Sequence, residues 1–244
     1  MGQRLYLEPD KFAFPVKDDL VVEETRDVQQ KKGDFWLIDE GKFLTDKEIM
    51  RLRRVATERA QTGRKARVRE WFLVELGLMS GLRVGEMAAL RVGDVFVDEG
   101  RCSVLVQNGK CGKRRVVLMP AEFKEVFKRY MGWKARWGEP VWDGAELFWS
   151  VRRGCGMTVR ALQKMFERVA AAAGLERFSV HSLRHTYATH LLRASRWNLR
   201  LVQRQLGHSS VAVTEAYLGV CDPDTHAALQ ALYRYSQEQE GTRC

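Results

Sequence analysis

Four side chains that could bind an anion, transfer a proton or act as a nucleophile lie in one C-terminal stretch, residues 178–220. His181 and Arg184 are three residues apart, so on a helix they share one face. His208 follows a Leu-Gly pair, and Tyr217 comes nine residues later. Arginine is a permanent forked donor for phosphate oxygens, and histidine can transfer a proton near neutral pH. Because nearby cations favour the deprotonated form of a tyrosine, its oxygen can attack phosphorus and form a covalent intermediate.

Two further segments carry charged side chains in a notable pattern. Arg83 and Glu86 are three residues apart, in a turn that leads into a short helix. Residues 107–114 are rich in glycine and strongly basic, and they lie between two strand-like segments as the tip of a hairpin. Taken singly, each of these residues fits an ordinary surface or core position. They form a site only if the fold brings the separate segments together.

Apolar periodicity and capping residues predict an α+β chain that is mainly α-helical with one small antiparallel β-sheet. Thr45 and Glu48 form a capping box at the start of the first helix, and Gly174 follows the end of a later one. Four tryptophans are predicted to be core residues: Trp133, Trp137, Trp142 and Trp149. The elements expected are helices over 45–60, 66–79, 120–137, 158–173 and 223–235, a short helix ending near 90, helical turns between 183 and 206, and strands over 95–97, 103–106 and 115–118.

The charge of the chain is basic and unevenly distributed. The formal net charge of the 244 residues is +10. Residues 1–44 hold seven Lys and Arg against ten Asp and Glu, whereas the remainder holds 34 against 21. A basic balance of this size indicates a polyanionic partner, nucleic acid first and an acidic membrane surface second. The basic surface therefore belongs to the chain after residue 44.

Cysteine usage indicates a reducing compartment. The five cysteines include no Cys-x-x-Cys pair, which argues against a disulfide framework and against a zinc site. His185 and His190 follow His181 by four and nine residues with no cysteine nearby, so a zinc site there is not expected either. No apolar run is long enough to span a membrane, and residues 1–20 contain no secretory signal. These features predict a cytoplasmic protein.

The motifs occur in an order that resembles the tyrosine recombinase (phage integrase) family. They are Ser-Gly-Leu-Arg-Val-Gly-Glu from residue 80, Gly-Lys-x-Gly-Lys-x-Arg-x-Val from residue 109, His-Ser-Leu-Arg-His-Thr-Tyr-Ala-Thr from residue 181, Leu-Gly-His, and a tyrosine nine residues later. The resemblance implies a tyrosine-recombinase catalytic-domain fold over 44–236, preceded by a short acidic segment (1–43) and followed by a tail (237–244). Family members usually carry a helical core-binding domain of about a hundred residues before the catalytic domain, a usual size for a small domain. Residues 1–43 are too few for such a domain.

The resemblance also implies a role for each catalytic residue. Tyr217 is expected to attack a scissile DNA phosphate, leaving a 3′-phosphotyrosyl bond and a free 5′-hydroxyl. Lys110 is expected to protonate the leaving 5′-oxygen, and His181 to assist proton transfer at the tyrosine. The remaining expected ligands of the phosphate are Arg83, Arg184 and His208, with Glu86 orienting its neighbours.

Other basic residues are expected to bind the DNA backbone. They are Lys113, Arg114, Arg115, Arg152, Arg153 and Arg160. Three of them, Lys113, Arg114 and Arg115, remain alternatives to Lys110 as the general acid. The resemblance implies no metal and no other cofactor, since arginine and lysine supply the positive charge.

The expected partner is double-stranded DNA, bound by a homotetramer that acts through a Holliday junction. The free protein is expected to be a monomer or a dimer, and an accessory DNA-bending protein is a further candidate partner. The protein is expected in the cytoplasm, associated with the nucleoid. There it is expected to integrate, excise or invert the DNA of a mobile element. Two alternatives stay open: a type IB topoisomerase, and a catalytically silent DNA-binding relative. The Leu-Gly-His motif favours the recombinase over the topoisomerase.

Overall fold

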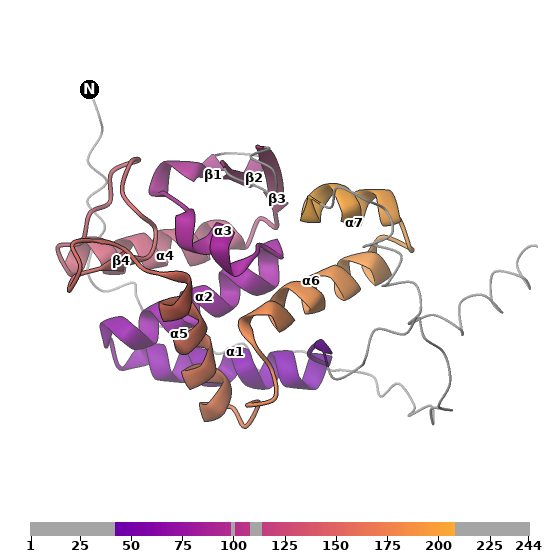
Figure 1. Cartoon of the computed structure of the whole chain (residues 1–244), viewed down its shortest axis with the longest axis horizontal. Coiled ribbons are helices and arrows are strands. Elements are labelled where there is room, and N and C mark those ends of the chain that lie inside the picture. Colours follow the sequence, from indigo (N-terminus) through magenta and orange to yellow (C-terminus); the bar gives the residue numbers. More distant parts are fainter. Residues whose placement is uncertain (1–41, 99–100, 108–113, 208–244) are drawn as a thin grey trace, which may run out of the picture.

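The computed structural model describes residues 42–98, 101–107 and 114–207, which form helices around a small sheet (Figure 1). In chain order the elements are α1 (Asp46–Gln61), α2 (Lys65–Ser80), α3 (Val84–Ala89), the 3₁₀ turn η3 (Val92–Asp94), β1 (Val95–Asp98), β2 (Arg101–Val106), β3 (Arg115–Met119), α4 (Phe123–Arg136), β4 (Trp149–Ser150), β5 (Cys155–Gly156), α5 (Val159–Ala172), α6 (Val180–Ala194) and α7 (Leu199–Leu206). The helix expected over 223–235, the tail and most of the acidic N-terminal segment lie outside the described residues.

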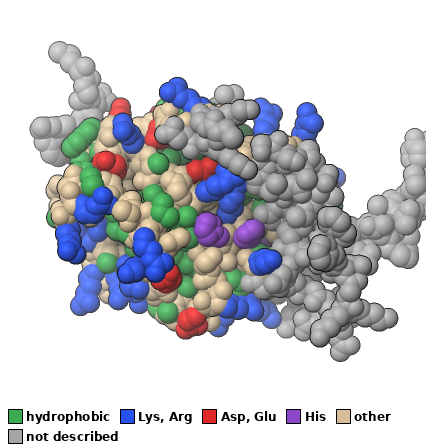
Figure 2. Space-filling view, in the orientation of Figure 1, with side chains coloured by type: hydrophobic (Ala, Val, Ile, Leu, Met, Phe, Trp, Pro, Cys, Tyr) green, Lys and Arg blue, Asp and Glu red, His purple; other side chains and the backbone are tan. Residues whose placement is uncertain are grey.

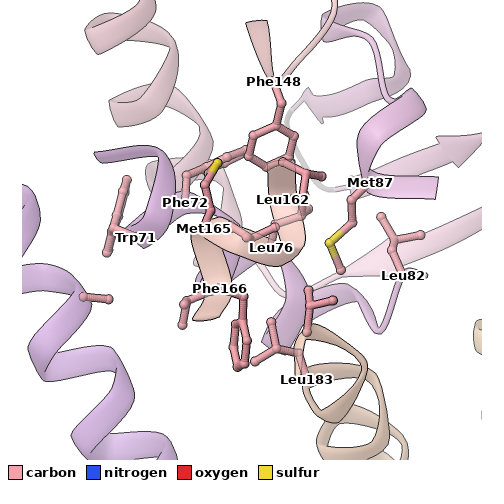
Figure 3. Close-up of a cluster of buried hydrophobic side chains, with 14 of the residues drawn as sticks. Trp71, Phe72, Leu76, Leu82, Met87, Phe148, Leu162, Met165, Phe166 and Leu183 are labelled. Atoms are coloured by element: carbon pink, nitrogen blue, oxygen red, sulfur yellow. The ribbon is translucent and has the colours of Figure 1, made fainter. Parts of the chain in front are cut away.

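Helix α2 is the centre of the core. Every residue from 68 to 77 is buried, as expected for a helix that is packed on all sides. It packs against α1, α4, α5, α6 and β3. Figure 3 shows Phe72 and Leu76 of α2 among apolar side chains of the surrounding elements, including Phe166 of α5 and Leu183 of α6.

A close approach between α2 and α6 depends on glycine. A Cβ atom at Gly77 would lie 2.5 Å from Cδ1 of Leu183. Gly81, which ends α2 with φ +61°, leaves a similar space that the ring of Tyr187 fills. These two glycines therefore set the distance between α2 and the helix that carries His181 and Arg184.

The three-stranded sheet is antiparallel in the order β1-β2-β3. Val95, Val104 and Val117 lie opposite one another in the ladder and are all buried. Phe96, Val116 and Leu118 are exposed, with their positions alternating with the buried ones. One face of the sheet therefore packs on the helices and the other faces outward.

A second, smaller apolar cluster joins α6 to α7. Its buried members are Ala188, Leu192, Val202 and Leu206, and they are separate from the main core. The turn between the two helices contains two non-glycine residues with positive φ, Arg196 at 51° and Trp197 at 64°. In Figure 1, α7 lies beside the end of α6 and the edge of the sheet.

The predicted class, mainly helical with a small antiparallel sheet, is confirmed. Three details differ. Helix α4 begins at Phe123 instead of Pro120, because residues 120–122 form a turn in which the Phe123 N–H donates to the Pro120 carbonyl at 3.1 Å. The short hairpin of β4 and β5 was not expected. Trp142, expected in the core, is 66% exposed.

No helix in the described part of the chain is both long and apolar enough to cross a bilayer.

Candidate active site

The turn from α2 into α3 positions the first arginine of the site. Arg83 is the N-cap of α3, and its backbone N–H donates to Oε2 of Glu86 at 2.8 Å. The same carboxylate accepts from Nη1 of Arg83 at 3.0 Å through Oε1. The short spacing of this motif thus caps the helix and fixes the guanidinium, whose side chain stays 33% exposed.

Helix α6 positions the second arginine. Arg184 is only 8% exposed, and Nη1 donates to the carbonyl of Gly81 at 2.7 Å. Its Nη2 donates to the carbonyl of Leu206, at the end of α7, at 2.9 Å. Since Leu206 is followed by Gly207 and His208 in the sequence, Arg184 links the turn before Arg83 to the approach to His208.

Strand β3 supplies a third guanidinium. Nη1 and Nη2 of Arg115 donate to Oε1 and Oε2 of Glu86, at 2.7 and 2.9 Å. Its Nε donates to the carbonyl of Gln205 at 3.4 Å. The 80–86 turn, the start of β3, helix α6 and the end of α7 therefore meet through side chains of three arginines and one glutamate.

The charge of this cluster is positive. Although burial would raise the pKa of Glu86, the hydrogen bonds from Arg115 and from the Arg83 backbone, with the charges of both arginines, hold it below its ordinary value. Among the residues that the structure describes, one ionised carboxylate thus accompanies the guanidiniums of Arg83, Arg115 and Arg184. An excess of guanidinium over carboxylate in one place is suited to binding phosphate oxygens.

Two histidines of α6 adjoin this cluster. His181 is exposed and His185 is half-buried. Burial, with the charges of Arg184, His181 and Lys42, lowers the pKa of His185, so this imidazole is neutral near pH 7. Figure 2 shows histidine side chains together on the surface next to Lys and Arg side chains.

The residues expected to contact the DNA backbone fall into two groups. Arg114, Arg152, Arg153 and Arg160 are exposed. Arg115 instead faces inward, with its side chain 13% exposed and its two terminal nitrogens on Glu86. The strand parity could have indicated this, because residues 115, 117 and 119 share the face that carries buried Val117 and Met119.

Four expected site residues lie outside the described residues, namely Lys110, Lys113, His208 and Tyr217. The segments that lead to them are described. Residue 107 is held by a bond from Nε2 of Gln107 to Oδ1 of Asp94 at 2.8 Å, and residue 115 by Glu86. Helix α7 is capped at its C-terminal end by Gly207, with φ +64°, one residue before His208 in the sequence.

Sequence reasoning did not single out Gln205. Its side-chain amide pairs with the backbone of Leu118, accepting from N–H at 3.1 Å and donating to the carbonyl at 2.9 Å. It also donates to the hydroxyl of Tyr187 at 3.0 Å. Gln205 therefore attaches α7 to the edge of β3, and no motif or periodicity in the sequence signals this contact.

Together these features define a basic α+β domain whose arginines meet where a helical turn, a sheet edge and a helix end come together. The chain belongs to the phage integrase family, whose model matches residues 42–222. It is 40% identical over 151 residues to tyrosine recombinase XerC of Neisseria gonorrhoeae, and 37% identical over 168 residues to tyrosine recombinase XerD of Ralstonia nicotianae. These matches cover 62% and 68% of this chain and 47% and 50% of the relatives. The chain therefore spans about half the length of the curated relatives it matches.

A solved structure shares the fold. The crystal structure of the XerH site-specific recombinase bound to difH substrate, a pre-cleavage complex, superposes with a TM-score of 0.63 at 26% identity. The match covers 77% of this chain and 53% of that one. The tyrosine-recombinase catalytic-domain fold predicted from the motifs is confirmed.

Proposed function

We propose that this chain is a site-specific DNA recombinase that cleaves and rejoins double-stranded DNA through a 3′-phosphotyrosyl intermediate. The observation that carries the proposal is that Arg184 joins the turn before Arg83 to the end of α7, since it donates to the carbonyls of Gly81 and Leu206 at 2.7 and 2.9 Å. In the same turn, Arg83 is held by Glu86 at 3.0 Å. Residues far apart in the sequence thereby place two guanidiniums close to the segment that leads to His208. The relatives named above are recombinases, which favours strand exchange over the topoisomerase alternative.

In the proposed reaction the oxygen of Tyr217 attacks phosphorus and displaces the 5′-oxygen of the next nucleotide. His181 assists removal of the tyrosine proton, and Lys110 protonates the leaving oxygen. Rejoining reverses these steps with a 5′-hydroxyl from the partner strand, so the energy of the phosphodiester is kept in the tyrosyl bond.

The phosphate itself is held by positive groups. Arg83, Arg184 and His208 bind the nonbridging oxygens, where negative charge increases in the transition state. Each such donor contributes about 10²–10³-fold in rate when it is preorganised. Exposed Arg114, Arg152, Arg153 and Arg160 bind neighbouring phosphates, together with Lys113. No metal or other cofactor takes part in this scheme.

The proposed organisation is a catalytic domain over 44–236, with 1–43 as a separate acidic segment and 237–244 as a tail. Four such chains act on two DNA duplexes through a Holliday junction, in the cytoplasm on nucleoid DNA. The free chain is a monomer or dimer, and an accessory DNA-bending protein assists assembly. The likeness to the XerH site-specific recombinase bound to difH substrate supports DNA as the partner.

Covalent trapping on DNA tests the proposal. Nicked suicide duplexes with a randomised central sequence are incubated with the chain, and those that stay attached in SDS are amplified and sequenced. The wild-type chain should select a defined site and form an SDS-resistant adduct, whereas Tyr217→Phe should form none. An adduct with the Phe variant would exclude Tyr217 as the nucleophile, and the absence of any adduct with wild type would reject the recombinase proposal.

A further inference from the structure

The side chain of Arg115 is largely buried, with 13% of it exposed, although the proposed reaction assigns it no role. It is the first residue of β3, and it lies on the inward face of the strand, whereas Val116 and Leu118 lie on the exposed face. Burial of a guanidinium is unfavourable unless the group is paired and hydrogen-bonded. Arg115 meets this requirement with three donors: two on Glu86 and one on the carbonyl of Gln205.

The space around Arg115 is closely fitted. A Cβ atom at Gly207 would lie 2.6 Å from Cδ of Arg115 and 2.8 Å from its Nε. The backbone after α7 therefore lies closer to the arginine than a residue with a Cβ atom would allow without a shift. The contact joins β3 to the last residue before His208, in addition to the bond with Gln205.

Glu86 is shared between two arginines in an unequal way. Arg115 binds both oxygens as a fork, at 2.7 and 2.9 Å, while the side chain of Arg83 has a bond to Oε1 alone, at 3.0 Å. A fork-to-fork pair of arginine and carboxylate is the stronger arrangement. Without Arg115, the carboxylate is able to turn toward Arg83 and form that pair there. Arg83 would then be neutralised by Glu86 and withheld from a phosphate.

We propose that Arg115 is a positioning residue: it engages both oxygens of Glu86 so that Arg83 keeps its charge and orientation for the scissile phosphate. The inference rests on the proposed function, because it assigns Arg83 to that phosphate. It differs from the expectation that Arg115 binds the DNA backbone. A residue that acts through Arg83 affects the chemical step, whereas a backbone contact affects affinity and its salt dependence.

Salt dependence separates these two roles. The affinity of each variant for a 30-bp duplex of arbitrary sequence is measured between about 50 and 200 mM salt, where each phosphate contact contributes about 0.9 to the slope of log K against log salt. Arg115→Gln should keep the wild-type slope, whereas Arg114→Gln, which changes the exposed neighbour, should lower it by about 0.9. A lowered slope for Arg115→Gln would overturn the inference.

The charge of the substrate tests the link to Arg83. Single-turnover cleavage is measured on the suicide duplex selected by the wild-type chain, with either the natural phosphate or a neutral methylphosphonate at the scissile position. Arg115→Gln should lower cleavage of the phosphate by about 10²-fold, the usual effect of a displaced catalytic group. On the methylphosphonate, which has no charge to neutralise, the deficit should shrink to within a few fold, as it should for Arg83→Gln.

Two controls keep the outcome unambiguous. Arg115→Lys keeps a cation beside Glu86 without the fork, so it should fold and show an intermediate deficit with the same methylphosphonate recovery. Arg54→Gln, which changes an exposed side chain of α1, should cleave both substrates as wild type does. The inference would be overturned if Arg115→Lys showed equal deficits on both substrates, or if both Arg115 variants cleaved at the wild-type rate. Either result would leave the proposed function standing. The absence of any adduct with the wild-type chain would overturn the proposed function and, with it, this inference.

Discussion

Replacing Gly77 by alanine should destabilise the protein, although alanine is the better helix former. The added Cβ would lie 2.5 Å from Cδ1 and 3.1 Å from Cβ of Leu183. Favourable carbon contacts begin at about 3.5 Å, so the first overlap is about 1 Å. Leu183 is fully buried, and its Cβ moves only with the backbone of α6. The side chain therefore has no open space into which to turn.

The magnitude follows from two opposing effects. Overpacking of a filled core costs about 1–3 kcal/mol, and replacing glycine within a helix returns about 1 kcal/mol. Because both partners are buried, we expect a net loss of about 1–2 kcal/mol. For a domain of this size each kcal/mol corresponds to about 2–4 °C in Tm. Gly85→Ala is the matched control, since no atom lies within 4 Å of the position of its Cβ. This control should be neutral or slightly stabilising.

The assay is urea unfolding of both single variants and of Gly77→Ala in a Leu183→Ala background. Leu183→Ala alone should cost about 2–5 kcal/mol, because it leaves a cavity. In that background the Gly77 substitution should become neutral or stabilising, since the atoms that it meets have been removed. Equal destabilisation in both backgrounds would refute the steric explanation. So would stabilisation by Gly77→Ala in the wild-type chain.

Two further predictions concern buried charges. The side chain of Glu70 is fully buried and forms ion pairs with three arginines, so Glu70→Gln should lower the free energy of unfolding by about 3 kcal/mol. Glu58→Gln, which changes an exposed ion pair, should lower it by less than about 0.5 kcal/mol. Equal losses for the two variants in urea unfolding would contradict this prediction. Burial lowers the pKa of Lys134 to about 8, against 10.5 ordinarily, although Glu139 acts in the opposite direction. The unfolded chain then binds more protons between these values, so this residue's contribution to stability should rise by about 3 kcal/mol as the pH increases from 8 to 10.5. The measurement is the difference in unfolding free energy between wild type and Lys134→Met across that range, and a difference independent of pH would show that Lys134 does not titrate as stated.

Local sequence signals predicted most of the fold. The Thr45 capping box is present in full, with the Thr45 backbone N–H donating to Glu48 at 2.8 Å and the Glu48 N–H donating to Thr45 Oγ1 at 3.4 Å. Such signals depend on neighbours in the chain, so they can be found without a structure. Trp142 was misplaced because hydrophobicity alone does not distinguish a loop from a core helix. Strands β4 and β5 have two residues each, too short for any periodicity.

The candidate site was less predictable because its contacts join distant segments. The spacing of Arg83 and Glu86 indicated a local pair, and this pair is present. The fork from Arg115 spans 29 residues, and the bond from Arg184 to Gly81 spans 103. Backbone carbonyls such as that of Gly81 have no sequence signature at all. The fork depends on the placement of β3 beside α3, and the bond to Gly81 on the packing of α6 against α2, both of which only the three-dimensional structure describes.

Because the apolar cluster beneath α7 is separate from the main core, the two parts of the protein should not unfold in one cooperative step. Leu183, in the first half of α6, belongs to the main core, whereas Leu192 in the second half packs with Val202 and Leu206. A small apolar cluster opens at a lower free energy than a large one, so amide protons of α7 should exchange with solvent well before those of α2. The end of α6 and α7 thus form a separate cooperative unit, which should unfold locally and refold while the main core stays folded.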